Sequence, residues 1–232
     1  MKRLKIWGKS LIELFFPRYC AACGKRLGGE EQALCIYCLA RLPRTNFHLW
    51  RDNPVDKLFW GKFPFGRASA WIYYHRSSSF AHMIHHFKYN GRKTLAYTLG
   101  KIIANEIQPS GFYDGIDYIM PIPLHEKRQR QRGYNQSTCL AAGMKEVTGI
   151  PLIEGAVIRA RYTETQTHKK AYERRENVHN VFQLVNGDLL NGKHVLIVDD
   201  VLTTSATISA CADVMRDIPG IRISVLALAV AK

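Results

Sequence analysis

Residues 194–207 decide the fold, and they read HVLIVDDVLTTSAT. The four apolar residues after His194 are mostly β-branched, which is typical of a strand that is buried on both faces of a parallel sheet. Asp199 and Asp200 end this strand, and small hydroxyl-bearing residues follow them. The stretch therefore predicts a buried strand, a short turn and then a helix. The apolar residues of this helix recur at helical spacing, at Ile208, Cys211, Met215 and Ile218.

The turn after this strand has the features of a phosphate-binding site. A helix amino terminus presents unpaired backbone N–H groups and a partial positive charge, and hydroxyl groups add further donors. Asp199 and Asp200 stand at the carboxyl end of the strand, where open α/β sheets bind ligands, so they are placed to accept hydrogen bonds from sugar hydroxyls, directly or through Mg²⁺. A simple helix cap needs a single hydroxyl, which this run exceeds. The candidate phosphate-binding residues are Thr203, Thr204, Ser205, Ala206 and Thr207.

Residues 187–193 are similar to a second nucleotide-binding pattern, the Walker motif, but they do not match it fully. His194 stands where a P-loop has its metal-binding serine or threonine. The string also precedes a strand instead of joining a strand to a helix. We therefore exclude a P-loop at this place.

The rest of the chain alternates between strand and helix patterns, which predicts an α/β fold with a largely parallel sheet flanked by helices. We expect an amphipathic start and a cysteine module in residues 1–50, a connector in residues 51–65 and the α/β domain in residues 66–232. The expected strands cover residues 67–74, 116–121, 157–162, 182–185, 194–201 and 222–231. The expected helices cover residues 78–89, 92–107, 135–147 and 206–216.

Four cysteines form two C-x-x-C pairs, Cys20 with Cys23 and Cys35 with Cys38. Two residues between thiolates let both sulfurs bind one ion at about 2.3 Å, and four thiolates leave no open coordination position. The pattern therefore predicts a structural zinc site. A redox motif would need one C-x-x-C near a βαβ unit, and disulfides do not suit a cytosolic chain.

The charge favours polyanionic partners, because 33 Lys and Arg residues face 19 Asp and Glu residues and give a formal net charge of +14. Phosphates, nucleic acid and an anionic membrane surface all fit this excess. Residues 1–16 lack the apolar run and the cleavage site of a signal peptide, and no segment approaches the roughly 20 apolar residues of a membrane span. We expect a cytoplasmic protein, whose amphipathic start packs on the cysteine module or contacts a membrane surface.

Two further basic segments are candidate contacts for pyrophosphate or nucleic acid. Residues 127–132 lie in a loop that enters a helix, and residues 169–175 form a second group. Preorganised Arg and Lys side chains stabilise the charge of a departing pyrophosphate, and the same groups contact nucleic-acid phosphates. A solvated charged surface is the simpler interpretation for Lys169 and Lys170. The candidate contacts are His125, Arg128, Arg130, Arg132, Lys169 and Arg174.

Several motifs in the same order resemble the ComF (ComFC) family, competence-associated proteins that have a zinc ribbon before a type I phosphoribosyltransferase domain. The four cysteines follow residues 16–17, and residues 199–207 resemble the family's signature for phosphoribosyl pyrophosphate (PRPP), with Ser205 in place of the usual glycine. The other matching segments are FKYNG at 87–91, PIPLH at 121–125, RGYNQ at 132–136, TQT at 165–167 and RREN at 174–177.

The resemblance implies a role for each of these segments. Asp199 and Asp200 would bind the ribose hydroxyls, and residues 203–207 would bind the 5′-phosphate. Residues 121–125 would form the pyrophosphate loop, and residues 163–177 the mobile loop that closes over PRPP. The implied cofactors are a structural zinc ion and Mg²⁺ bound with PRPP.

The sequence leaves two functions open. In the first, the chain binds PRPP or another sugar phosphate, and single-stranded DNA, during DNA uptake in natural transformation, with a DNA-translocating helicase as its partner. In the second, it is a phosphoribosyltransferase that moves ribose 5-phosphate from PRPP to an acceptor and releases pyrophosphate. The resemblance favours the first function, and the residues indicate neither an acceptor nor a catalytic base.

Overall fold

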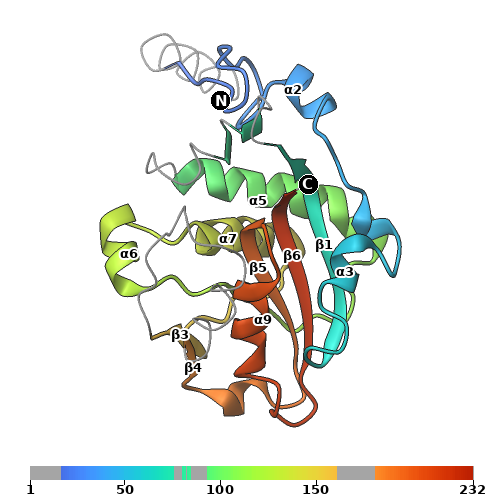
Figure 1. Cartoon of the computed structure of the whole chain (residues 1–232). Helices are drawn as coiled ribbons and strands as arrows, with labels where there is room; N and C mark the ends of the chain where they lie inside the picture. Colours follow the sequence, from blue (N-terminus) through green and yellow to red (C-terminus); the bar gives the residue numbers. More distant parts are fainter. Residues whose placement is uncertain (1–16, 76–79, 82, 85–92, 161–180, 232) are drawn as a thin grey trace, which may run out of the picture.

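The computed structural model describes residues 17–75, 80–81, 83–84, 93–160 and 181–231. A four-stranded sheet forms its centre, with the strand order β1-β6-β5-β2. All neighbouring strands in this sheet run parallel, which confirms the expected parallel α/β sheet (Figure 1). The strands are β1 (Phe65–Tyr74), β2 (Tyr118–Pro121), β5 (His194–Leu202) and β6 (Arg222–Ala231).

Helices cover both faces of the sheet, so successive residues of β5 are buried in two different clusters. Leu196 and Val198 pack in one cluster with α5 (Lys93–Ile107) and α7 (Gln136–Thr148). Val195 and Ile197 pack in the other cluster with α9 (Ala206–Asp213). Side chains of a strand point alternately to the two faces, and a strand covered on both faces therefore has the continuous apolar run seen in the sequence.

The helices α5 and α7 pack closely because each has a glycine at the contact. A Cβ atom added to Gly100 would overlap the carbonyl oxygen of Leu140, and one added to Gly143 would overlap the carbonyl oxygen of Tyr97. Small residues let two helix backbones approach this closely. The pair forms a tight layer on one face of the sheet.

The cysteine module packs against the same layer. Leu27, Leu34 and Leu42 share the buried cluster with Ile72 of β1. The described part of the module includes a short α-helix, α2 (Ile36–Ala40). After the last of the four cysteines, the Arg44 Nε atom lies 2.7 Å from a carboxylate oxygen of Glu106 on α5. The segment that contains α2 is therefore held at one end of the sheet (Figure 1).

The segment between the cysteine cluster and β1 covers the other face of the sheet. It contains η1 (Phe47–Leu49) and α3 (Pro54–Lys57), and Phe59 is fully buried. The side chain of Asn53 caps α3 and also donates to the carbonyl oxygen of Ala68 in β1, over 2.9 Å. Residues 51–65, expected as a connector, thus pack along β1.

The remaining elements lie beside the sheet, and three of them differ from the expectation. Residues 127–132, expected in a loop, form a helix of their own, α6 (Glu126–Arg132), because the His125 side chain caps its start and Gly133 ends it with a φ of 76°. The strands β3 (Val157–Arg159) and β4 (Phe182–Leu184) begin where expected but pair antiparallel with each other outside the main sheet. Short 3₁₀ helices cover Gln108–Ser110 and Gly187–Leu190.

Some expected features lie outside the described residues. These are the amphipathic start, residues 163–177 and most of the expected helix 78–89. Within the described part of the chain, no helix combines the length and the apolar character needed to cross a membrane.

Candidate functional site

The carboxyl ends of β2 and β5 meet at one edge of the sheet. Pro121 pairs with Val198 in the parallel register, and the Ile122 amide donates to the Val198 carbonyl oxygen over 2.9 Å. The side chain of Asn135, which caps α7, donates to the carbonyl oxygen of Ile122 over 2.9 Å. Residues 121–125 are thereby fixed beside the acidic end of β5.

The two carboxylates at this edge accept hydrogen bonds from neighbouring amides and from Ser137. Asp199 Oδ1 accepts from the Asp200 amide over 2.8 Å and from Ser137 Oγ over 3.4 Å. Asp200 Oδ1 accepts from the Val201 amide over 2.6 Å. Both residues are half-buried, and each carboxylate has further acceptor capacity for a sugar hydroxyl or a cation.

The turn from β5 into α9 has an unstrained backbone. Ser205 is the N-cap of α9 with a φ of −72°, so serine at the position of the signature glycine needs no left-handed conformation. Its carbonyl oxygen accepts from the Ser209 amide over 2.8 Å. Thr203 and Thr204 are exposed, whereas Ala206 and Thr207 are half-buried.

Two basic side chains come to this site from segments that the sequence did not single out. Lys62 Nζ donates to Ser205 Oγ over 2.7 Å. Arg159, at the end of β3, lies within electrostatic range of Asp199: burial and Arg128 lower the pKa of the Arg159 guanidinium, and Asp199 partly offsets them. Neither residue belongs to a local sequence pattern with its partner. Lys62, for example, is 143 positions from Ser205 in the sequence.

A cleft of about 940 Å³ lies next to residues 121–125. It is bounded by the end of β2, by α6, by the start of α7 and by β3. Lys93 Nζ stands 5.8 Å from the centroid of the Tyr134 ring in this cleft, and Thr138 donates to Glu154 over 2.8 Å. The described lining contains none of residues 199–207, so the phosphate turn is not part of this cleft.

The predicted basic contacts divide into three groups. His125 and Arg130 line the cleft, and Arg130 also forms an exposed ion pair of 2.8 Å with Glu126. Arg128 and Arg132 are on α6 but are not part of the described lining. Lys169 and Arg174 lie outside the described residues.

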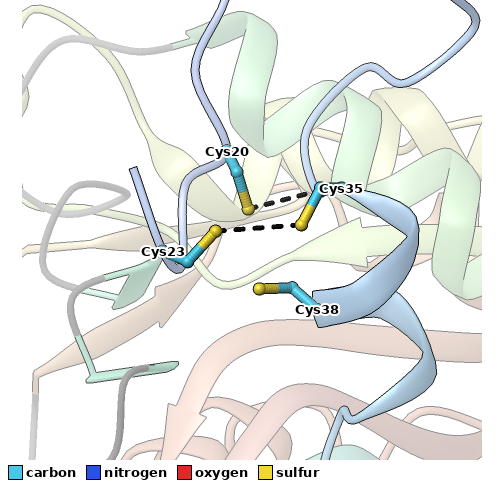
Figure 2. Close-up of side chains that lie close together, drawn as sticks. All are labelled: Cys20, Cys23, Cys35 and Cys38. Carbon is cyan, nitrogen blue, oxygen red and sulfur yellow. Dashed lines mark hydrogen bonds between the residues drawn. The ribbon is translucent and has the colours of Figure 1, made fainter. Parts of the chain in front are cut away.

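The four cysteine side chains converge, as Figure 2 shows. All four sulfur atoms lie within 4.8 Å of one another, and the sulfurs of Cys23 and Cys35 are 3.8 Å apart. Zn–S bonds of about 2.3 Å in a tetrahedral site place sulfurs roughly 3.8 Å apart, whereas a disulfide bond is about 2.05 Å long. All four cysteines are free, so the donor set and its spacing fit one zinc ion.

The backbone of both knuckles supports these thiolates. Gly24 adopts a φ of 72°, and its amide donates to the Cys20 carbonyl oxygen over 2.9 Å. Burial raises the pKa of the Cys20 thiol, but hydrogen bonds from the amides of Cys35, Cys23 and Ala22 outweigh burial and lower the pKa to about 7. Cys38 follows Cys35 within the first turn of α2, so both sulfurs face the same point.

Sequence comparison places the chain among known proteins. The DNA utilization protein YhgH of Escherichia coli O157:H7 is 30% identical over 199 residues, which cover 84% of this chain and 83% of that protein. The chain belongs to the YhgH/ComF family. The Competence protein F of Haemophilus influenzae is 28% identical over 92% of this ComF-family chain and 85% of its own length. The Competence protein ComFC of Bacillus subtilis is 32% identical over 40% of the chain and 36% of its own length.

These relatives confirm the resemblance that the motifs indicated. No family model matches the chain. Among solved structures, the ComF-family chain is similar to the allosteric regulatory enzyme of purine biosynthesis, with a TM-score of 0.39, and to glutamine PRPP amidotransferase from B. subtilis, with a TM-score of 0.40. Each is 21% identical over 61% of this chain, which spans 30% of that enzyme chain.

Proposed function

We propose that this ComF-family chain binds PRPP together with Mg²⁺, binds single-stranded DNA, and acts in DNA uptake during natural transformation. One observation carries the proposal: the acidic end of β5 lies beside residues 121–125 at one edge of the sheet. Ligands of open α/β sheets bind at this edge. The helix α9 begins at the same place, and we assign the 5′-phosphate to its amino terminus because such helix ends bind phosphate.

Each part of PRPP has complementary groups in this arrangement. Asp199 and Asp200 accept hydrogen bonds from the ribose hydroxyls, and their carboxylate oxygens are the ligands that Mg²⁺ prefers. The amides and hydroxyls of residues 203–207 hold the 5′-phosphate. Residues 121–125 hold the pyrophosphate, and basic side chains neutralise its charge. The proposed basic contacts are His125, Arg128, Arg130, Arg132, Lys169 and Arg174.

Single-stranded DNA is the second proposed ligand. Proteins that bind it combine a basic groove with aromatic side chains on which bases stack. The cleft beside β2 supplies the basic part of such a groove, since Lys93 and Arg130 line it, whereas the lining residue Tyr134 is only 6% exposed. The formal net charge of +14 and the names of the relatives, a DNA utilization protein and a competence protein, support the same ligand. Contact with a DNA-translocating helicase belongs to this proposal.

We propose that zinc at Cys20, Cys23, Cys35 and Cys38 is structural. Four thiolates complete a tetrahedral shell and leave no position for substrate. The bound ion would fix the fold of the module in residues 1–50, and residues 66–232 would carry the ligand sites, with residues 51–65 joining them. These parts of the chain differ in their proposed function but do not have separate cores, because the buried residues of the cysteine module share a cluster with the sheet.

The cleft favours a second function, phosphoribosyl transfer. Its volume of about 940 Å³ is in the range of small-molecule sites, and it borders the proposed pyrophosphate segment. An acceptor bound there would give an electron pair to C1 of the ribose, while the bond from C1 to the pyrophosphate oxygen breaks and the acceptor loses a proton. The basic residues around the cleft would stabilise the pyrophosphate as it leaves.

Thermal protection tests the binding proposal, and pyrophosphate release separates the two functions. PRPP with Mg²⁺ at 100 times its dissociation constant stabilises the folded state by about 2.7 kcal/mol, so the melting temperature of the zinc-loaded chain should rise. Mg²⁺ with unphosphorylated ribose is the control. An unchanged melting temperature at millimolar PRPP would contradict the proposal, and pyrophosphate release with a nucleobase or nucleotide acceptor would establish the transferase.

A further inference from the structure

A lysine from the segment before β1 reaches the phosphate turn. Lys62 Nζ donates a hydrogen bond of 2.7 Å to the hydroxyl oxygen of Ser205. Ser205 is the N-cap of α9, so the ammonium group stands at the helix end to which the proposed function assigns the 5′-phosphate. The lysine is exposed, and a ligand in the turn can reach it.

The backbone that carries Lys62 is anchored on both sides. Phe59 is fully buried and Phe63 is 7% exposed, and their ring centroids are 5.7 Å apart. The Lys62 amide donates to the Phe59 carbonyl oxygen over 3.2 Å, which closes a turn. The ammonium group also stands 6.0 Å from the centroid of the Phe59 ring. The backbone at Lys62 is therefore already ordered, so less conformational entropy is lost when the ammonium group is held in place.

The hydroxyl group of Ser205 explains why the Lys62 side chain is held at the turn. The sequence has serine where the PRPP signature usually has glycine, and a glycine would offer no hydroxyl to the lysine. The φ of −72° at Ser205 shows that the serine is accommodated without backbone strain. The hydroxyl accepts a hydrogen bond from the ammonium group and so directs it toward the turn.

We propose that Lys62 binds the 5′-phosphate of a ribose phosphate in the turn, with Ser205 as its positioning residue. An ammonium group carries three donors, so it can contact a hydroxyl and a phosphate oxygen together. Charge-assisted hydrogen bonds to phosphate are about twice as strong as neutral ones, and the lysine adds a full charge to the partial charge of the helix end. The ligand class is therefore a 5′-phosphorylated ribose, and the inference rests on the proposed PRPP site.

Calorimetry of the full, zinc-loaded chain with three probes tests this role. The probes are ribose 5-phosphate, PRPP with Mg²⁺ and inorganic pyrophosphate with Mg²⁺. Lys62→Met removes the charge but keeps the apolar stem, and we expect roughly tenfold weaker binding of the first two probes, the loss of one charge-assisted hydrogen bond. Binding of pyrophosphate should not change, because that group occupies residues 121–125.

Lys57→Met is the matched control. It removes the same charge from the same segment, but Lys57 Nζ stands 6.0 Å from the centroid of the exposed Trp60 ring and not at the turn. This variant should bind all three probes as the wild type does. Wild-type affinity of Lys62→Met for ribose 5-phosphate would overturn the role of Lys62 alone, whereas a wild-type chain that binds neither ribose phosphate would overturn the proposed site itself.

Discussion

The backbone amide of Ile122 donates a hydrogen bond of 2.9 Å to the carbonyl oxygen of Val198. This bond extends the pairing of β2 with β5 by one residue beyond Pro121. It joins two segments that are far apart in the sequence, residues 121–125 and the acidic end of β5. The proposed pyrophosphate and ribose sites are therefore neighbours because the two strands are parallel and adjacent.

Asp200→Asn should weaken PRPP binding at least tenfold and leave the affinity for single-stranded DNA unchanged. The amide oxygen of asparagine can still accept the hydrogen bond that Asp200 Oδ1 now accepts from the Val201 amide, but the charge that attracts Mg²⁺ is lost. Calorimetry with PRPP and fluorescence anisotropy with a labelled oligonucleotide measure the two affinities.

The matched control for this prediction is Asp188→Asn, since Asp188 is exposed on a 3₁₀ helix away from the turn. It should change neither affinity. Equal losses of PRPP and DNA binding in Asp200→Asn would show that the two ligands share one site.

Cys38→Ser should abolish zinc binding and destabilise the chain. Apparent binding free energies of structural zinc in small zinc-finger peptides are about 10–16 kcal/mol near pH 7, so loss of a ligand removes a large part of the stabilisation. Elemental analysis should find one zinc ion per wild-type chain and almost none in the variant. Cys139→Ser, a half-buried cysteine outside the cluster, should keep the zinc. A metal-free wild type with an unchanged melting temperature would disprove a structural role.

Stability should fall as the pH drops below about 6.5, the ordinary pKa of histidine. Burial and Arg222 lower the pKa of His194, so the unfolded state binds a proton at a higher pH than the folded state does. Protonation then favours unfolding, and the stabilisation from neutral His194 is lost on acidification through this window.

Comparing a His194 variant with the wild type isolates the contribution of His194 to this pH dependence. The ring contacts Ser224 Oγ over 2.8 Å and the Gly115 carbonyl oxygen over 3.1 Å, and His194→Gln keeps a polar side chain there. Melting temperatures of this variant should change less between pH 7 and pH 5.5 than those of the wild type. Identical slopes would assign the pH dependence to other groups, among them the buried His48, whose pKa burial also lowers.

Single-stranded DNA binding should depend on salt through the basic residues of α6. Each phosphate contact contributes about 0.7 to the slope of log K against log salt for single strands. Replacing Arg128 and Arg132 by alanine together should lower the slope by roughly 1.4 on that basis. Arg216→Ala, at an exposed ion pair with Asp213, is the control. An unchanged slope in the double variant would exclude Arg128 and Arg132 from the DNA contact.

The sequence predicts the parts of the site that depend on local patterns. The apolar run, the acidic pair and the hydroxyl residues lie next to one another, so β5, the turn and α9 were predicted from spacing alone. The two C-x-x-C pairs indicated a convergent cysteine cluster for the same reason. The last strand matches the expected residues 222–231 because residues 225–231 of β6, like residues 195–198 of β5, form an uninterrupted apolar run.

The features that the sequence did not predict depend on tertiary contacts or on weak local signals. Lys62 approaches Ser205 only because Phe59 and Phe63 pack on the sheet. Arg159 lies within electrostatic range of Asp199 and belongs to β3, which pairs with β4 outside the main sheet. The helix α6 has no apolar stripe, and its signals are a histidine cap and the glycine that ends it.

Calorimetric titration of PRPP with Mg²⁺ into the zinc-loaded chain tests the central claim most directly. We predict saturable heat with one PRPP bound per chain, and much weaker heat when ribose without phosphates replaces PRPP. Titration of millimolar PRPP without detectable heat, under conditions in which the chain is folded, would contradict the claim that the end of β5 is a sugar-phosphate site.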